Sequence, residues 1–378
     1  MSNVDPNAAA VERILLSAPD VGDLDRQALL RAFDEGWIAP LGPELNGFEA
    51  ELCDYTGAAA CAGLSSGTAA LQLGLQLVGV EHGDEVVVQS ATFAASAFAA
   101  VHAGAVPVFC DSDAATWCMD PEVLHQFLSE RAAVDRLPAA VMPVDLYGFV
   151  PDYERLVEVC TEFGVPVVED AAEALGSIVS EGKHAGTFGR VGVYSFNGNK
   201  IMTTSGGGAM IGDPEMVAKA RWLASQARED HVWYEHLEIG FNFRMSNLLA
   251  ALGRSQLASL EDKVKRRSEI NRVYREQLPQ LAWAPAGVTE RPNNWLSVGL
   301  LPAGIDPMEV CVQMSAQGVE SRPFWKPMHQ QPVFAGNEMI GGDVSNELFA
   351  RGLCLPSGSV MTEAQQERVI ATLAAILG

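Results

Sequence analysis

A single lysine in a polar loop is the strongest candidate for a catalytic residue. Lys200 follows a strand-like run, residues 191–196, and precedes three consecutive glycines, residues 206–208. Ligands bind at the ends of strands in α/β sheets. Apolar surroundings disfavour the ammonium form of a lysine and leave an amine that can attack an aldehyde. Most lysines in polar loops are solvated and inert, so this stretch alone leaves both interpretations open.

An aspartate upstream favours the chemical interpretation. Asp170 comes directly after another strand-like run, residues 165–169. A reactive lysine and a buried aspartate are the pair that pyridoxal 5'-phosphate (PLP) requires. The lysine forms a Schiff base with the aldehyde, and the aspartate keeps the pyridine nitrogen protonated. The two residues together therefore predict PLP as the cofactor.

A serine-rich turn, SSGT at residues 65–68, offers a place for the cofactor's phosphate. The turn lies between a predicted strand and a predicted helix, so its amides and hydroxyls meet at the positive end of the helix dipole. Gly67 and Thr68 belong to this turn, and the Ser195 hydroxyl could add a contact from the lysine loop. Such a turn is more often only a helix cap. The lysine and the aspartate make the anion site the better interpretation.

Two further residues could face the cofactor. Phe93 begins a predicted helix after a strand and could lie against the flat ring, although on its own it would be assigned to the core. Glu173 follows Asp170 by three residues and could project toward the same site. Its alternative role is that of a helix cap.

Composition limits the class of protein. A chain of 378 residues predicts two or three domains. No apolar run approaches the roughly 18 residues that a membrane span needs, and the amino terminus lacks the pattern of a signal peptide. We therefore expect a soluble, cytoplasmic protein without a membrane partner.

Charge and cysteine content argue against nucleic-acid binding, a disulfide framework and a zinc site. The net charge of -23 argues against nucleic acid as a partner, because phosphates require a basic surface. The seven cysteines contain no CxxC pair, which fits neither a disulfide framework nor a zinc site. We predict no metal site.

Strand and helix patterns alternate along residues 58–226, which predicts an α/β fold with a largely parallel central sheet between helices. Helices are also predicted over residues 8–35 and, as one long helix with Ser246 as its cap, to about residue 278. Residues 279–378 are richer in proline and mix short strands with helices. We expect a large PLP-binding domain at residues 1–250 and a smaller C-terminal α+β domain at residues 251–378.

Several spaced motifs, in order along nearly the whole chain, resemble those of the PLP-dependent sugar-nucleotide aminotransferases of the DegT/StrS type. The motifs are SSGTAAL (65–71), TF (92–93), VEDAAEALGS (168–177), GTFG (186–189), YSFNGNK (194–200), GGGA (206–209) and GFNFRMSNL (240–248).

The resemblance implies a fold type I aminotransferase that forms a homodimer with active sites at the subunit interface. Many family members have glutamine or histidine where Glu173 stands, near the cofactor's phenolic oxygen, and many have asparagine where Phe98 stands. A dehydrating branch has histidine in place of the lysine, so Lys200 argues against that branch. Carried over by position, the site consists of Lys200 as Schiff-base lysine, Asp170 as partner of the pyridine nitrogen, Phe93 as stacking ring, Gly67, Thr68 and Ser195 as phosphate ligands, and Asn242 from the other subunit.

Four further segments look like the subgroup that aminates C4 of UDP-4-keto-6-deoxy-N-acetylglucosamine on the route to bacillosamine. They are WIAPLGP (37–43), NWLS (294–297), SRPFWKPMHQQPVF (321–334) and CLPSG (354–358). This likeness implies L-glutamate as amino donor and a UDP-linked ketosugar as acceptor.

Arg322, Lys326 and His329 are predicted to form a cationic cluster in an otherwise acidic protein, and such a cluster would attract a diphosphate. The alternative is that Arg322 and Lys326 pair with surface carboxylates.

Two other functions remain open at this point. The enzyme could aminate a different sugar, such as a 3-keto or a dTDP- or GDP-linked 4-keto hexose. A protein that binds PLP as a regulator or scaffold without turnover is the alternative outside enzymes. The joint presence of Lys200, Asp170 and the basic residues counts against that alternative.

Overall fold

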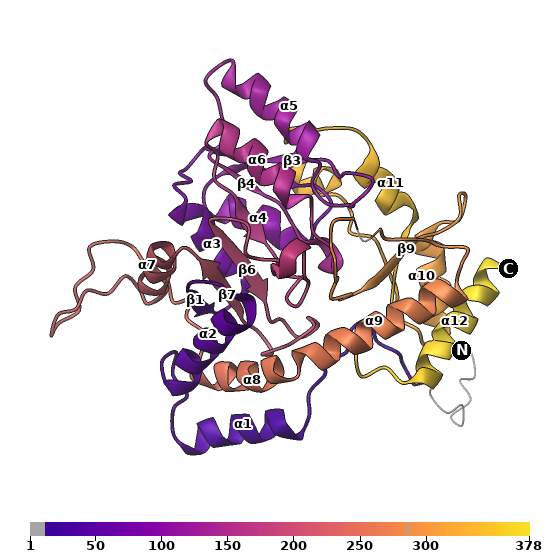
Figure 1. The fold of residues 1–378 in the computed structure, drawn as a ribbon, viewed down its shortest axis with the longest axis horizontal. Coiled ribbons are helices and arrows are strands. Elements are labelled where there is room, and N and C mark those ends of the chain that lie inside the picture. The colour runs from indigo at the N-terminus through magenta and orange to yellow at the C-terminus, as the bar shows by residue number, and fades with distance from the viewer. Residues whose placement is uncertain (1–11, 286) are drawn as a thin grey trace, which may run out of the picture.

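The computed structural model describes residues 12–285 and 287–378 (Figure 1). Two four-stranded sheets, ordered β1-β7-β6-β5 and β4-β2-β3-β11, meet where β4 and β5 form parallel bridges. All neighbours are parallel except β7, which runs antiparallel to β1 and β6. The strands are β1 (Cys61–Leu64), β2 (Glu85–Gln89), β3 (Val106–Cys110), β4 (Ala140–Met142), β5 (Val168–Asp170), β6 (Val191–Ser195), β7 (Gly208–Gly212) and β11 (Met339–Ile340).

Helices cover both faces of this largely parallel sheet, as alternation in the sequence predicts. In β2, Val86 and Val88 enter one apolar cluster with α3, α4 and α7, while Val87 enters the other with α2, α5, α6 and α8. These helices are α2 (Pro43–Thr56), α3 (Gly67–Leu77), α4 (Ala94–His102), α5 (Pro121–Ala132), α6 (Tyr153–Phe163), α7 (Pro214–Ala224) and α8 (Asn247–Ala258).

Local sequence signals set several helix ends. Asp120 and Asp213 accept hydrogen bonds from the first turns of α5 and α7, and each precedes a proline at the first helical position. Helix α6 ends at Gly164, whose φ of 68° is easily reached without a side chain.

The C-terminal part of the chain builds its own antiparallel sheet, ordered β10-β12-β9-β8. Strand β11 leaves this part and pairs with β3 of the central sheet. The predicted division between residues 250 and 251 falls inside α8 and stays a prediction. The elements are β8 (Ala282–Trp283), β9 (Ser297–Leu300), β10 (Arg322–Pro323), β12 (Gly352–Leu355), α9 (Leu260–Gln277), α10 (Pro307–Ala316), α11 (Val344–Arg351) and α12 (Glu363–Leu377).

Two helix predictions differ from the structure. Of the helix predicted over residues 8–35, residues 8–11 lie outside the described part, and α1 covers Asp23–Asp34. Ile14 instead forms a parallel bridge with Val319. The long helix predicted after Ser246 is two helices, α8 and α9, which break at Ser259, where the side chain bonds back to the Gln256 carbonyl.

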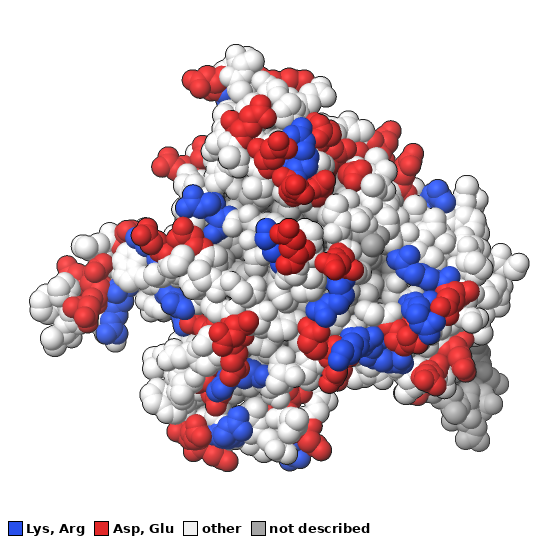
Figure 2. Space-filling model, in the orientation of Figure 1, with Lys and Arg blue, Asp and Glu red and all other residues white. Residues whose placement is uncertain are grey.

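Charged side chains of both signs share the face of the molecule in Figure 2, where Lys and Arg lie beside Asp and Glu. Helix α9 contributes pairs of this kind, such as Arg272 with Glu269 at 2.6 Å. None of the helices within the described residues is both long and apolar enough to span a bilayer.

Candidate active site

A cavity of about 300 Å³ lies at one edge of the central sheet. Strands β1, β2, β5 and β6 point the same way, so the segments that follow them meet at this edge. This is the edge at which ligands bind in open α/β sheets. Residues at the ends of these strands or just after them line the cavity, among them Ser66, Gly67, Thr68, Thr92, Phe93, Asp170, Glu173, Ser195 and Lys200.

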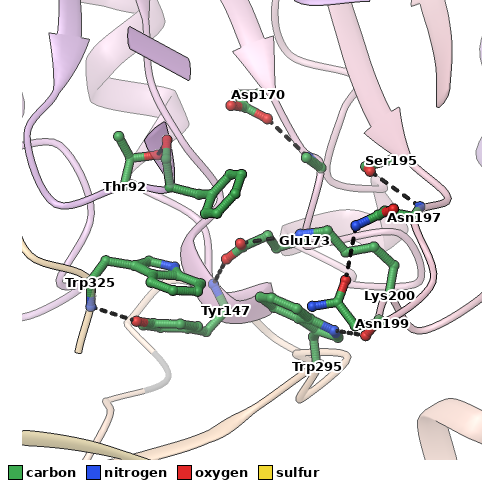
Figure 3. A network of polar contacts seen from close by, with 12 residues as sticks. Thr92, Tyr147, Asp170, Glu173, Ser195, Asn197, Asn199, Lys200, Trp295 and Trp325 are labelled. Carbon is green, nitrogen blue, oxygen red and sulfur yellow. Dashed lines mark hydrogen bonds and ion pairs between the residues drawn. The ribbon is translucent and has the colours of Figure 1, made fainter. Parts of the chain in front are cut away.

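The β6–β7 hairpin holds the lysine over this cavity. Its loop, residues 196–207, is fixed by hydrogen bonds from Phe196 N to Gly207 O and from Thr204 N to Phe196 O, each 2.9 Å long. The Lys200 side chain is only 11% exposed, and its Nζ lies 3.2 Å from Glu173 Oε1. The hairpin therefore presents a largely buried amine to the cavity (Figure 3).

Aromatic side chains enclose the lysine from the C-terminal part of the chain. Lys200 Nζ lies 3.9 Å from the centre of the Trp295 ring, and Trp295 Nε1 donates to Asn199 O at 2.7 Å. Tyr147 stacks beside both Trp295 and Trp325, with interplanar angles of 23° (Figure 3). These tryptophans line the cavity, although neither was predicted as a site residue from the sequence.

Tyr147 also links this aromatic group to the acidic side of the cavity. Its backbone N–H donates to Glu173 Oε2 at 2.8 Å, and its hydroxyl accepts from Trp325 N at 3.0 Å. Tyr147 has a φ of 56°, a conformation that non-glycine residues rarely adopt outside constrained positions. The fully buried residue thus orients the carboxylate that pairs with Lys200.

Asp170 is a buried carboxylate, 3% exposed, at the end of β5. It accepts hydrogen bonds from Ser96 Oγ at 2.7 Å and from Ala172 N at 3.2 Å. Burial raises the pKa of Asp170 to about 6, although the Ser96 hydrogen bond acts in the opposite direction. Lys200, in the same cavity, forms its ion pair with Glu173 instead. A buried carboxylate in this situation suits a protonated ring nitrogen as its partner.

The turn before α3 has free backbone donors. Ser66 caps the helix by accepting from Ala69 N at 3.1 Å. Gly67 and Thr68 occupy the first helical positions, where an amide has no acceptor within the helix. A Cβ at Gly67 would lie 3.2 Å from Ser195 Cβ, so a larger residue would crowd the turn. The turn therefore fits both interpretations, the helix cap and the anion site.

Seven residues predicted for the cofactor line one cavity: Gly67, Thr68, Phe93, Asp170, Glu173, Ser195 and Lys200. Phe93 is 52% exposed, which excludes its alternative assignment to the core, and its ring lies 5.5 Å from that of Trp325. The lysine, the buried carboxylate and the turn that could bind an anion fit PLP as a group. The individual roles of these residues stay predictions.

Four other predicted residues do not line this cavity. Asn242 forms a bridge with Ser225, between α7 and α8. Arg322 is exposed and pairs with Glu320 at 2.9 Å, which is the alternative that the sequence left open for it. The remaining two are Lys326, which is half-buried, and His329, whose Nδ1 lies 2.7 Å from Ser90 Oγ.

The arrangement of elements is shared with solved aminotransferase structures. A DegT DnrJ EryC1 StrS aminotransferase from Brucella abortus superposes with a TM-score of 0.86 at 31% identity, over 94% of this chain and 95% of that one. The protein therefore has the fold of a type I aminotransferase.

Sequence comparison identifies the family. A model of the DegT/DnrJ/EryC1/StrS aminotransferase family matches residues 19–374. EpsN of Bacillus subtilis (strain 168) is 44% identical over 370 residues, 96% of this chain and 95% of that protein. GDP-perosamine synthase of Caulobacter vibrioides is 34% identical over 372 residues, 97% of this chain and 98% of its own length. The chain belongs to the DegT/DnrJ/EryC1/StrS family and is a PLP-dependent sugar aminotransferase.

Proposed function

We propose that the protein transfers the amino group of L-glutamate to C4 of a UDP-linked 4-keto-6-deoxy-N-acetylhexosamine and so makes a UDP-4-amino sugar. The observation that carries the proposal is the placement of Lys200 and Asp170 in one cavity with the turn at Gly67. A nucleophilic amine, a buried carboxylate and backbone donors for an anion are the three things that a PLP site requires.

The residues of the cavity suggest how PLP would be held. The Gly67 and Thr68 amides and the Ser195 hydroxyl would bind its phosphate, Asp170 would keep its pyridine nitrogen protonated, and Phe93 would cover its ring. Lys200 would attach its aldehyde carbon covalently. When bound, PLP supplies the electron sink that allows an amino group to leave one carbon and join another.

Proton movement would then fall to Lys200. The Lys200 amine would take the proton from Cα of glutamate and would later deliver a proton to C4 of the sugar. Glu173 Oε1, 3.2 Å from Nζ, and the Trp295 ring, 3.9 Å away, would stabilise the ammonium form between these transfers. General acid–base catalysis of this kind contributes about 10²- to 10⁴-fold to a rate.

The choice of sugar rests on the segments that enclose the cavity. NWLS and SRPFWKPMHQQPVF, which suggested the UDP-sugar subgroup, contribute Trp295 and Trp325 to its lining. Trp295 and Trp325 would therefore contact a sugar bound in the cavity.

A GDP-linked 4-keto sugar is the second candidate acceptor. It is favoured by the 34% identity with GDP-perosamine synthase over nearly the full length of both chains. A dTDP-linked or 3-keto sugar would leave the roles of Lys200 and Asp170 unchanged, because these residues act on the carbon and nitrogen atoms rather than on the nucleotide.

The test is a side-by-side product analysis. Purified protein, PLP and glutamate are incubated with UDP-, GDP- and dTDP-linked 4-keto sugars, and the new amine is located by mass spectrometry and NMR. Lys200→Ala protein supplies the background. We expect an amine at C4 and the highest kcat/KM with the UDP-linked acetamido sugar.

The other outcomes separate the alternatives. A higher kcat/KM with a GDP- or dTDP-linked sugar would move the proposal to that nucleotide. If glutamate converts PLP to its amine form but no sugar is aminated, the aminotransferase assignment stands and the sugar is wrong. If glutamate causes no spectral change, a PLP-binding regulator is the better description.

A further inference from the structure

Two of the seven cysteines face a second cavity, away from the candidate active site. Cys53 lies in the last turn of α2, and Cys61 is the first residue of β1. Both line a cavity of about 440 Å³ together with Glu49, Arg221 and Arg244. Helices α2 and α7 both pack on β1. Cys53 and Cys61 therefore come from elements that lie side by side (Figure 1).

The Cys53 thiol is activated by its surroundings. The neighbouring Cys61 thiol and the positive charge of Arg221 lower the pKa of Cys53 to about 7, against the opposing effects of partial burial and of the Glu49 and Asp54 carboxylates. A thiol with such a pKa is a thiolate for much of the time near neutral pH, and the thiolate is the reactive form.

Arg221 provides a donor at the same place. Its Nη2 binds Glu49 Oε2 at 3.0 Å and also donates to the Cys61 carbonyl, which fixes the guanidinium beside the start of β1. Its Nε is buried and has no acceptor among the described residues. This N–H could bind an anionic sulfur, or the oxygen of an oxidised cysteine.

The other cysteines have different surroundings, and all of them lie within the described residues. Cys311 is half-buried like Cys53, but burial raises its pKa. The remaining four are buried, and burial is the largest cause of their raised pKa values: Cys110, Cys118, Cys160 and Cys354. Cys311 is therefore a matched control for partial exposure without activation.

We propose that Cys53 and Cys61 form a site of reversible oxidative modification, in which a hydroperoxide converts the two thiols to a disulfide. The Cys53 thiolate attacks one peroxide oxygen, the O–O bond breaks, and with one proton the products are a sulfenic acid and water. The Cys61 sulfur then attacks the Cys53 sulfur, the S–O bond breaks, and the hydroxyl leaves with the Cys61 proton as a second water. Each disulfide thus consumes one hydrogen peroxide.

Neither cysteine lines the candidate active site, so this inference does not depend on the proposed aminotransferase chemistry. Cys61 is buried and its pKa is raised, which suits a resolving thiol that reacts only with its immediate neighbour.

The test uses the complete protein with its cofactor. Limiting hydrogen peroxide is added near pH 7, free thiols are blocked, and the digest is analysed by mass spectrometry with and without a reducing agent. We expect a Cys53–Cys61 cross-link that has lost two hydrogen atoms and is reversed by reduction. Without peroxide, an alkylating agent should label Cys53 about tenfold faster than Cys311.

Cysteine variants distinguish the attacking thiol from the resolving thiol. In Cys61→Ser, Cys53 should accumulate as a sulfenic acid that dimedone traps. In Cys53→Ser, Cys61 should remain reduced, and Cys311→Ser should form the cross-link as the unmodified protein does. The inference is overturned if the cross-link joins other cysteines, if none forms, or if Cys53 is labelled no faster than Cys311.

Discussion

Lys200 is the residue on which the proposed chemistry depends most. Replacement by alanine removes both the covalent attachment and the proton carrier, so turnover should fall by at least about 10²- to 10⁴-fold. Lys265→Ala is the matched control, because Lys265 pairs with Asp262 at the surface. Steady-state amination assays measure both. A Lys200→Ala protein that keeps most of its activity would remove the basis of the mechanism.

Asp170 should affect the stability of the protein even without the cofactor. Its pKa is about 6 in the folded protein and about 4 in an unfolded chain, so the native state holds the proton more tightly. The free energy of unfolding therefore falls as the pH rises from about 4 to about 6, and it stays lower above that range. Two pKa units correspond to a penalty of about 3 kcal/mol at neutral pH.

Asp170→Asn should accordingly stabilise the cofactor-free protein at pH 7.5 while abolishing efficient turnover. Below about pH 4 the two proteins should have nearly equal stability, because both side chains are then neutral. Thermal unfolding at several pH values measures the difference. Asp262→Asn, at an 86% exposed side chain, serves as control. Equal stabilities at pH 7.5 would show that Asp170 carries no such penalty.

At the scale of elements, the N-terminus of α3 contains a helix cap and is proposed to bind the cofactor's phosphate. Ser66→Ala removes the hydrogen bond to Ala69 N and should cost about 1 kcal/mol of stability. It should also weaken PLP binding, because the cap orients the turn proposed to bind the phosphate.

Thr362 caps α12 in the same way, by accepting from Gln365 N, but α12 belongs to the C-terminal part of the chain. Thr362→Ala should therefore cost similar stability and leave PLP affinity unchanged. Titration of the cofactor-free variants by absorbance measures that affinity. Equal PLP affinities in the two variants would argue that the α3 turn does not hold the phosphate.

The alternation of strands and helices along residues 58–226 could be predicted from the sequence because its signals are local. Ser246 caps α8, as expected, by accepting a hydrogen bond from Leu249 N. Strands β8, β10 and β11 have two residues each and arise only from pairing with distant segments, so no local pattern predicts them.

The site was predictable in part for the same reason. Asp170 ends a strand and Lys200 and the α3 turn follow strands, and strand ends could be recognised locally. Trp295 and Trp325 lie in the NWLS and SRPFWKPMHQQPVF segments, but only folding brings them into one cavity with Lys200. Ser96 had no separate signal, because its bond to Asp170 links α4 to β5.

At the scale of the whole molecule, the segment between α7 and α8 extends away from the body of the protein (Figure 1). It exposes a cluster of large apolar side chains, of which Val232 is 103% and Ile239 is 92% accessible. Clusters of this kind mark interaction surfaces. We propose that a second copy of the chain covers them in a homodimer, with Asn242 at the base of the segment.

Val232→Asp combined with Ile239→Asp should therefore shift the protein from dimer to monomer in sedimentation velocity. Val312→Asp, on α10 and 71% exposed, should leave the dimer intact. The monomeric variant should also bind PLP more weakly if Asn242 completes the neighbouring site. A native protein that sediments as a monomer would refute the shared site.

The most direct test of the account is to locate the cofactor on the chain. The native protein is loaded with PLP, reduced with borohydride, digested, and analysed by mass spectrometry. We predict a phosphopyridoxyl group on the peptide that contains Lys200, and none in the Lys200→Ala protein. A group on another lysine, or the same labelling in Lys200→Ala, would contradict the assignment of this cavity as the active site.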